Sequence, residues 1–318
     1  MAQDEFAIIE HYFSSIGKPA DNIVLGIGDD AAVVEVPPTV QLVVSMDTLV
    51  GGVHFPSDTS PADIAYKALA VNLSDLAAMA ATPAWFLLAL TLPQNDATWL
   101  HQFASGLSQA ADSFNLQLIG GDTCHGELSI SIQIAGLVPS ARYVTRRHAS
   151  PGDLILVTGE LGNAALGLAY KQGKIDLPQN LQAKCLLALN RPHPRLELVP
   201  FLREYASAAI DISDGLQGDL AHLLKASGCG AKIEQLALPV NDWIEQMNCY
   251  DYALAAGDDY EICCSVPLRH RAEIDRWNRG HPDCRLSIIG EITESGYILR
   301  DGERLTNLDN AQGYQHFD

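Results

Sequence analysis

Six short acidic segments, beside apolar strand-like runs or on one helix face, constrain this chain more than any other feature. Carboxylates that gather at strand ends repel one another, and each costs several kcal/mol to bury unless a positive group meets it. A hard divalent cation removes that conflict, and Mg²⁺ prefers a few carboxylates together with waters and substrate phosphates. Metal-bridged phosphoryl transfer is the chemistry that most needs several such acids. The six segments are Gly26–Asp30, Ser45–Asp47, Asn72 with Asp75, Gly120–Thr123, Asp211–Gly215 and Gly257–Glu261.

Any one of these segments also has a simpler interpretation, because Asp beside Gly is common in ordinary turns. The chain as a whole is acidic: 39 Asp and Glu against 20 Lys and Arg give a formal net charge of −19. The simpler interpretation of such a net charge is that it keeps the protein soluble. It argues against a nucleic-acid surface, which needs clustered Lys and Arg, and against docking on anionic lipid.

The cysteines and the uncharged segments indicate a cytoplasmic protein. Seven cysteines occur without a C-x-x-C pair, so neither a disulfide framework nor a zinc site is expected. Asp4 and Glu5 stand where a signal peptide would carry positive charge. The longest uncharged stretch, residues 76–95, is interrupted by Pro83 and is expected to be a helix end followed by a strand over residues 85–92, not a membrane span.

The order of predicted elements indicates two domains of the α+β class, each of α/β type. In the first half, Ser60, Pro61 and Asp63 predict the start of a long helix through an N-cap and a capping box. A basic, turn-rich stretch then separates it from a second series of strands and helices. We expect an N-terminal domain over residues 1–138, a linker over 139–153 and a C-terminal domain over 154–318. Predicted strands cover 31–36, 40–45, 85–92, 116–119, 128–138, 154–158, 208–212, 232–235, 260–266 and 286–291, and a hairpin with its turn at Asp301-Gly302 covers 297–305.

Several catalytic motifs are absent from the sequence. It contains no Walker A loop, no protein-kinase motif set, no G-x-S-x-G and no H-E-x-x-H. Gly26-Ile-Gly28 matches part of a dinucleotide loop, but the two acids that follow would repel a pyrophosphate. Phosphate charge must therefore be met by metal, by backbone N–H groups or by a few arginines. Arg146 and Arg147 are the best placed of these, and their alternative is a solvated linker.

Together the acidic segments and their flanks resemble the thiamine-monophosphate kinase family. The superfamily of these kinases also contains aminoimidazole ribonucleotide synthetase and selenophosphate synthetase. The similarity extends over nearly the whole chain. The most specific blocks are Ser45-Met-Asp-Thr-Leu-Val-Gly-Gly-Val-His-Phe55 and Lys67-Ala-Leu-Ala-Val-Asn-Leu-Ser-Asp-Leu-Ala77; Gly26–Ala31, Gly120–Thr123, Asp211–Leu216 and Gly257–Glu261 are shared across the superfamily.

This resemblance implies phosphorylation of thiamine monophosphate by ATP, giving thiamine diphosphate. It implies a homodimer in which two N-terminal sheets pair into a β-barrel and the C-terminal domain packs over the cleft. No residue is expected to act as a covalent catalyst, since the substrate phosphate itself attacks. The implied Mg²⁺ ligands are Asp30, Ser45, Met46, Asp47, Asp75, Asp122, Asp211 and Asp214. The implied ATP contacts are Gly121, Asp122, Arg146 and Ser213, and the implied substrate contacts are His54, Glu261 and Tyr314.

The residues themselves leave simpler alternatives for two of these positions. His54 could orient a phosphate or serve a structural role, and Tyr314 could stack on a cationic thiazolium ring or merely pack. Met46 departs from the small residue expected there, which is harmless only if this position acts through its carbonyl. Two alternatives to the kinase are an enzyme similar to aminoimidazole ribonucleotide synthetase and a non-catalytic, acidic metal-binding dimer. Selenophosphate synthetase is disfavoured because no Cys lies in the Gly-rich N-terminal segment, and the carbamoyl-dehydrating hydrogenase maturation protein because no Cys ends the chain.

Overall fold

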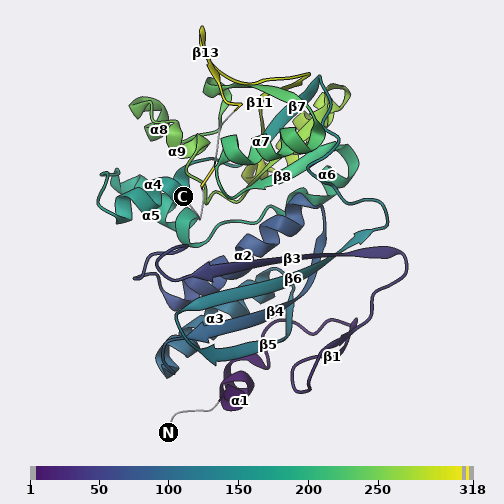
Figure 1. The fold of residues 1–318 in the computed structure, drawn as a ribbon, viewed down its shortest axis with the longest axis vertical. Coiled ribbons are helices and arrows are strands. Elements are labelled where there is room, and N and C mark those ends of the chain that lie inside the picture. Colours follow the sequence, from purple (N-terminus) through teal and green to yellow (C-terminus); the bar gives the residue numbers. More distant parts are fainter. Residues whose placement is uncertain (1–4, 310–312, 315–318) are drawn as a thin grey trace. The chain divides into compact units, whose positions relative to one another are not determined.

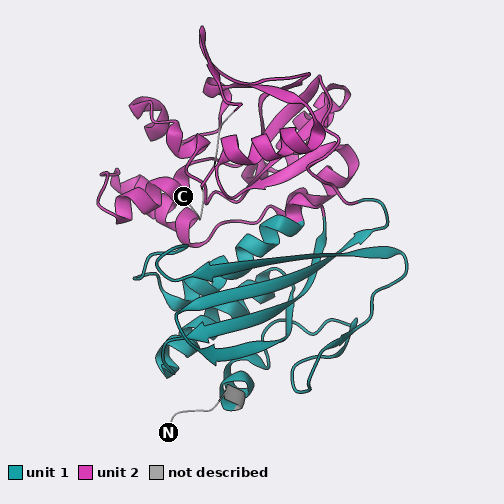
Figure 2. Ribbon diagram, in the orientation of Figure 1, with its two compact units in different colours: residues 1–76, 81–142 teal, residues 77–80, 143–318 magenta. Residues whose placement is uncertain are grey.

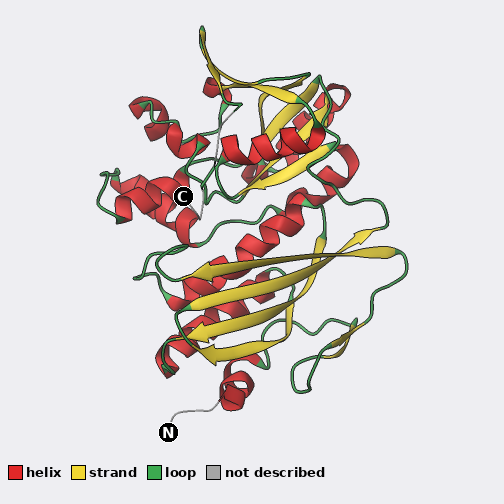
Figure 3. Ribbon diagram, in the orientation of Figure 1, coloured by secondary structure: helices red, strands yellow, loops and turns green. Residues whose placement is uncertain are grey.

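The computed structural model of the chain describes residues 5–309 and 313–314, and it divides into two compact units. Unit 1 contains residues 1–76 and 81–142, and unit 2 contains residues 77–80 and 143–318 (Figure 2). The chain leaves unit 1 between Arg142 and Tyr143, inside the stretch predicted as a linker. Both units combine helices with a sheet (Figure 3), in agreement with the predicted mixture of helix and strand.

Unit 1 contains a four-stranded sheet in the order β3-β6-β4-β5 (Figure 1). The pairs β3/β6 and β6/β4 are antiparallel, whereas β4 and β5 are parallel and are connected through helix α3. A small hairpin of β1 and β2 precedes it. The elements are α1 Glu5–Ile8, the π-helix η1 Ile9–Phe13, β1 Ile23–Leu25, β2 Val33–Val34, β3 Val40–Val50, α2 Pro61–Ala78, β4 Thr82–Leu92, α3 Ala97–Ser113, β5 Gln117–His125 and β6 Ser129–Pro139.

Helix α2 begins as the sequence predicts. The Ser60 hydroxyl accepts the Asp63 N–H at 3.2 Å and donates to Asp63 Oδ2 at 2.8 Å. These contacts satisfy an N–H group that has no partner inside the helix. The predicted N-cap at Ser60 is confirmed, while the Asp63 carboxylate accepts the Ser60 hydroxyl and not the Ser60 N–H of a full capping box. The cap marks the start of α2, which carries Asn72 and Asp75.

The two faces of the unit 1 sheet have different surroundings. On one face Ile130, Ile132 and Ile134 of β6 are buried, and helices α2 and α3 cover this side (Figure 1). On the other, open face, Val44 and Met46 of β3 are exposed, and the β1–β2 hairpin packs over only part of the face through Ile23 and Val34. Side chains alternate along a strand, so consecutive residues of β3 reach different surroundings.

Two strands are longer than the sequence indicates. Asp47 and Asp122 were expected at turns that follow strands, but both lie inside strands, β3 and β5 respectively. The expectation of a turn at these positions is wrong because neighbouring strands hydrogen-bond to the backbone there: Asp47 pairs with Ile132 of β6, and Asp122 pairs with Ala89 of β4. Tertiary pairing therefore outweighs the low strand propensity of Asp.

Unit 2 contains a seven-stranded sheet in the order β13-β12-β9-β11-β7-β10-β8, in which only β12 and β9 pair in parallel. The elements are β7 Asp153–Thr158, α4 Asn163–Lys171, α5 Gln179–Asn190, η2 Leu196–Leu198, α6 Val199–Tyr205, β8 Ala208–Ile212, α7 Leu216–Ser227, β9 Gly230–Glu234, η3 Gln235–Ala237, α8 Asp242–Met247, α9 Asp251–Leu254, β10 Glu261–Pro267, η4 Leu268–His270, α10 Arg271–Gly280, η5 Pro282–Cys284, β11 Leu286–Thr293, β12 Tyr297–Asp301 and β13 Arg304–Asn307.

Both faces of this sheet are covered. Alternate residues of β10 enter different cores: Cys263 lies in one and Cys264 in the other. The first core also contains residues of α4, α5, α7 and α9, and the second contains residues of α6 and α10. The sequence did not predict the short helices α6, α8 and α9, whose apolar residues are too few for a clear helical period. No helix in the described part of the chain has the length and apolarity to cross a membrane.

Candidate functional site

Unit 1 brings together three of the predicted site positions between β3 and α2. The Ser45 hydroxyl donates to Asp75 Oδ2 at 2.5 Å, and the Asp47 N–H donates to Asn72 Oδ1 at 3.0 Å. Ser45 and Asp47 share the helix-covered face of the sheet, since their partners on β6 are the buried Ile134 and Ile132. Asn72 in turn donates to the Ala68 carbonyl at 2.9 Å. Two side chains of α2, Asp75 and Asn72, therefore hold Ser45 and Asp47 of β3 in place.

His54 lies in the loop that follows β3, and two contacts fix it. The Val50 N–H donates to His54 Nδ1 at 2.9 Å, so in the neutral ring Nε2 carries the proton. Lys67 Nζ donates to the His54 carbonyl at 3.3 Å, although only 2% of Lys67 is exposed. Lys67 begins one of the sequence blocks that carry the family resemblance, but it is not among the site residues predicted from the sequence. The loop therefore presents His54 as a hydrogen-bond donor.

Asp122 and Met46 lie on the open face of the same sheet. Asp122 pairs with Ala89, Ala89 with Ser131 and Ser131 with Thr48, and the Thr48 and Ser131 hydroxyls are 2.7 Å apart. Residues opposite one another across a sheet share a face, so Asp122 belongs to the row of Thr48 and not to that of Asp47. Met46 is 60% exposed. The Met46 side chain lies on the opposite face of the sheet from the side chains of Ser45 and Asp47. Met46 can therefore share a ligand with them only through its backbone carbonyl.

Gly121 precedes Asp122 and tolerates no side chain. Its φ is +153°, and a Cβ atom would lie 1.8 Å from the Leu88 carbonyl oxygen of β4. This close approach of backbone explains why strand β5 needs Gly immediately before Asp122. Asp30, by contrast, is exposed in the loop between β1 and β2, where its N–H donates to Asp29 Oδ1 at 2.8 Å.

In unit 2 the predicted site positions follow strand β8. Asp211 is buried in that strand, and Ser213 and Asp214 form a turn before α7. The Asp214 N–H donates to Asp219 Oδ2 at 3.0 Å, and the Asp214 carbonyl accepts the Tyr314 N–H at 3.0 Å. Tyr314, near the C-terminal end of the described chain, is thereby brought beside Asp214, 100 residues earlier in the sequence.

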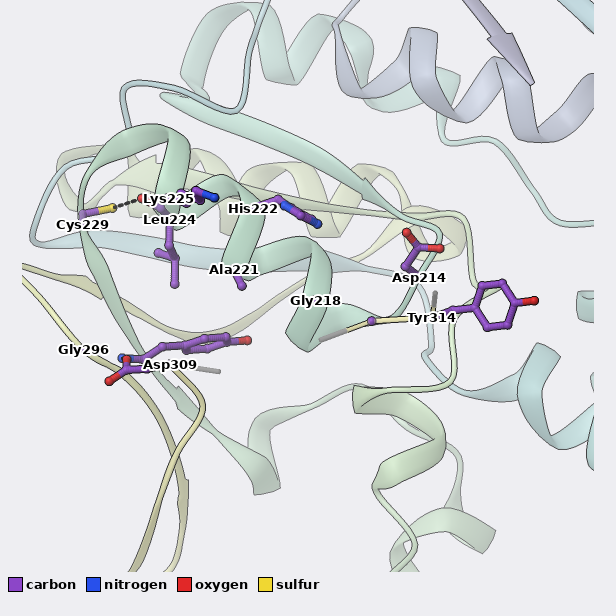
Figure 4. A pocket seen from close by; sticks show the side chains of 12 residues that line it. Asp214, Gly218, Ala221, His222, Leu224, Lys225, Cys229, Gly296, Asp309 and Tyr314 are labelled. Atoms are coloured by element: carbon purple, nitrogen blue, oxygen red, sulfur yellow. Dashed lines mark hydrogen bonds between the residues drawn. The ribbon is translucent and has the colours of Figure 1, made fainter. Parts of the chain in front are cut away.

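A pocket of about 530 Å³ adjoins this turn in unit 2. Asp214 and Tyr314 lie at one of its ends, and Lys225, in the last turn of α7, and Cys229, just after that helix, lie at the opposite one (Figure 4). Burial raises the pKa of Asp219, and the charge of Asp214 adds to this, while the Asp214 N–H, Arg146 and the Ser213 N–H lower it; the result is about 7. The exposed Arg146 therefore supplies positive charge near the Asp214 turn.

Glu261 occupies a buried position at the start of β10. Arg195 donates to it twice, from Nε to Oε2 at 2.6 Å and from Nη2 to Oε1 at 2.5 Å, and the Thr158 hydroxyl donates to Oε2 at 2.5 Å. Glu261 and Arg195 are 6% and 9% exposed. Burial lowers the pKa of Arg195, but the hydrogen bond and charge of Glu261 raise it more, above its usual range. Arg195 was not predicted as the partner of Glu261.

The available ligands for a cation are oxygen atoms. Over residues 5–309 and 313–314, no three His, Cys, Asp or Glu side chains converge closely enough to hold a metal ion. Two of the predicted ligands, Ser45 and Asp75, contact each other as a hydroxyl and a carboxylate. Such a set can bind a hard cation that brings its own waters or phosphates, and it offers little to a soft metal.

Comparison with known proteins gives matches over almost the whole chain. The family model "AIR synthase related protein, N-terminal domain" matches residues 28–138, and its C-terminal counterpart matches residues 150–301. A thiamine-monophosphate kinase of Escherichia coli K12 is 45% identical over 325 residues, which cover 100% of this chain and 99% of that protein.

Solved structures give the same result. The crystal structure of a thiamine-monophosphate kinase from Stenotrophomonas maltophilia K279a is 41% identical with a TM-score of 0.83, over 89% of this chain and 92% of that one. AaThiL, complexed with AMPPCP and TMP, is 30% identical with a TM-score of 0.76, over 92% of each chain.

Proposed function

The chain belongs to the thiamine-monophosphate kinase family, within the AIR synthase related proteins, and we propose that it transfers the γ-phosphoryl group of ATP to thiamine monophosphate. The observation that carries this proposal is the match, over 92% of each chain, to a relative solved with AMPPCP and TMP, combined with the oxygen-rich sites of this chain. AMPPCP has the phosphates of ATP with a carbon bridge that resists cleavage. The products would be thiamine diphosphate and ADP.

The reaction needs no protein nucleophile. A phosphate oxygen of thiamine monophosphate forms the new bond to the γ-phosphorus, and the bond from that phosphorus to the β–γ bridging oxygen breaks as ADP leaves. The protein must hold two anionic groups in line and stabilise their charge. We assign His54 Nε2–H to donate to the substrate phosphate, Arg146 and Ser213 to contact ATP, and the backbone at Gly121 to approach its phosphates.

Mg²⁺ fits the ligands that this chain offers. Mg²⁺ needs only one or two protein carboxylates when substrate phosphates and waters complete its shell. We propose that it is held by carboxylates and by backbone or hydroxyl oxygens, and that when bound it neutralises phosphate charge. The proposed ligands are Asp30, Ser45, the carbonyl of Met46, Asp47, Asp75, Asp122, Asp211 and Asp214.

We further propose that two copies of the chain associate through the open face of the unit 1 sheet. Leu42, Val44 and Met46 form an exposed apolar row on β3, which is the kind of surface that marks a protein interface. Asp122 lies on this same face, so pairing would bring the acid of one copy toward the other, in the barrel that the family resemblance implies.

The unpaired thiols of all seven cysteines support a reducing, cytoplasmic setting.

The association can be tested by sedimentation of Val44→Asp against Leu236→Asp, an equally drastic change at an exposed apolar residue of unit 2. Only Val44→Asp should produce monomers. Wild-type chain that sediments as a monomer at micromolar concentration would contradict the proposal.

The reaction can be tested by following a mixture of wild-type chain, Mg²⁺, ATP and thiamine monophosphate by phosphorus NMR. Thiamine diphosphate should appear with an equal amount of ADP. Asp47→Asn should abolish the product, whereas Asp63→Asn, at the start of α2, should retain it. ATP turnover without thiamine diphosphate would contradict the substrate and would favour an acceptor of the aminoimidazole class.

A further inference from the structure

The carboxylate of Asp219, in the first turn of α7, is a buried acid beside the Ser213–Asp214 turn that the proposed reaction does not use. Only 4% of Asp219 is exposed. It accepts the Asp214 N–H at 3.0 Å and also a backbone hydrogen bond from Ser213. A buried carboxylate is weak support for stability in itself, because its removal from water costs more than its contacts return. What this carboxylate does accomplish is to hold two consecutive amide groups of one turn.

That turn is held from three directions. Asp219 binds its N–H groups, the Ser213 carbonyl accepts the Asp258 N–H at 2.7 Å, and the Asp214 carbonyl accepts the Tyr314 N–H at 3.0 Å. Gly313 makes the last contact possible, because a Cβ atom there would lie 2.7 Å from the Asp214 carbonyl oxygen. The Asp214 peptide group is therefore fixed on both sides, by Asp219 at its N–H and by the C-terminal segment at its carbonyl.

We propose that Asp219 is a positioning residue, which fixes the Ser213–Asp214 turn so that the turn can bind Mg²⁺-ATP and seat Tyr314. This inference rests on the proposed function, since Ser213 and Asp214 take their roles from it. Asp219 itself touches no substrate: its oxygens face the backbone of its own turn. Substituting a residue that orients a ligand-binding group without touching the ligand typically lowers affinity or activity about 10–100-fold.

The chain offers a matched control in Asp153. It is also a buried acid of unit 2, at 6% exposed, and it also holds a turn, accepting the Ser150 N–H at 3.1 Å and the Ser207 hydroxyl at 2.6 Å. Asp153→Asn and Asp219→Asn thus make the same chemical change at two buried acids that hold backbone, and only Asp219 holds the site.

The first measurement is thermal unfolding with and without Mg²⁺ plus AMPPCP, which reports ligand binding without turnover. The Tm of each variant without ligand serves as that variant's own reference. The ligands should raise the Tm of Asp153→Asn as much as that of the wild type, and should raise that of Asp219→Asn clearly less. In turnover, KM for ATP should increase about 10–100-fold for Asp219→Asn alone.

Equal ligand shifts and equal KM values in the two variants would overturn the inference. If Asp219→Asn does not fold, Asp219→Glu keeps the charge but moves it by one methylene, and it should show the same weakened response to AMPPCP. A wild-type chain that binds AMPPCP but makes no thiamine diphosphate would overturn the proposed function and leave the positioning role of Asp219 to be decided by the thermal shifts.

Discussion

Glu261 can be a structural residue of unit 2 or a contact of the substrate. Arg195→Met tests the structural role, because it removes the charge that compensates this buried carboxylate. Glu261 would keep only the Thr158 hydroxyl of its three donors to the carboxylate. Removing one partner of a buried ion pair costs about 3–5 kcal/mol. For a unit of this size each kcal/mol lowers Tm by about 2–4 °C, so the transition of unit 2 should fall by about 6–20 °C.

The companion variant is Arg195→Met combined with Glu261→Gln, which removes both charges. Because neither ion remains to be buried alone, the double variant should recover at least half of the lost stability. Scanning calorimetry of the ligand-free wild type, of Arg195→Met, of Glu261→Gln and of the double variant measures the three losses of stability. A loss below about 1 kcal/mol for Arg195→Met, typical of an exposed pair, or a double variant whose loss equals the sum of the single losses, would refute this reasoning.

Kinetics of the same double variant then address the substrate role of Glu261. If Glu261 contacts thiamine monophosphate, the double variant should be stable and yet show a raised KM for that substrate. An unchanged KM would make Glu261 a structural residue of unit 2, and the substrate contact implied by the family resemblance would be wrong for this chain.

Three further predictions concern single residues. Gly121→Ala should lower the stability of unit 1 by at least about 2 kcal/mol in urea unfolding, because its Cβ would lie 1.8 Å from the Leu88 oxygen; a smaller loss would contradict the close approach. Tyr314→Ala should raise KM for thiamine monophosphate about tenfold through loss of ring stacking, while Tyr314→Phe should not; equal effects would exclude stacking. Burial raises the pKa of Glu197, but the hydrogen bond with His193 and the charge of Arg195 lower it more, to about 2 from 4.5. The ionised Glu197 therefore stabilises the fold above pH 4.5, and this stabilisation is lost toward pH 2. In unfolding measurements Glu197→Gln should be about 1 kcal/mol less stable than the wild type at pH 6, after discounting for partial exposure, and no less stable near pH 2. A difference that persists at pH 2 would contradict the lowered pKa of Glu197.

Local signals in the sequence predicted a large part of the fold. The N-cap pattern at Ser60 gave the start of α2, and the apolar runs gave most strands of both units to within a few residues. The predicted strands ended before Asp47 and Asp122, whereas β3 and β5 continue through these residues. A polar residue inside a strand is stabilised by pairing with neighbouring strands, and a local sequence pattern carries no information about that pairing.

The site was predictable in type but not in arrangement. Acidic segments indicated an oxygen-rich site, yet the separation of Asp122 from Asp47 by the sheet depends on strand register. Arg195 could not be assigned to Glu261, since 66 residues separate them. Lys67 and Asp219 are charged residues on helices, where solvent exposure is the usual expectation, and only the packed structure places them against the backbone of the site.

The measurement that tests the central claim most directly is the stereochemistry of the transfer. ATP with a chiral, thio-substituted γ-phosphorus would be incubated with thiamine monophosphate, Mg²⁺ and the wild-type chain, and the configuration of the transferred phosphorus in the thiamine diphosphate analogue determined. Direct in-line attack by the substrate phosphate predicts inversion. Retention would contradict the account, because it requires a phosphorylated residue of the protein as an intermediate.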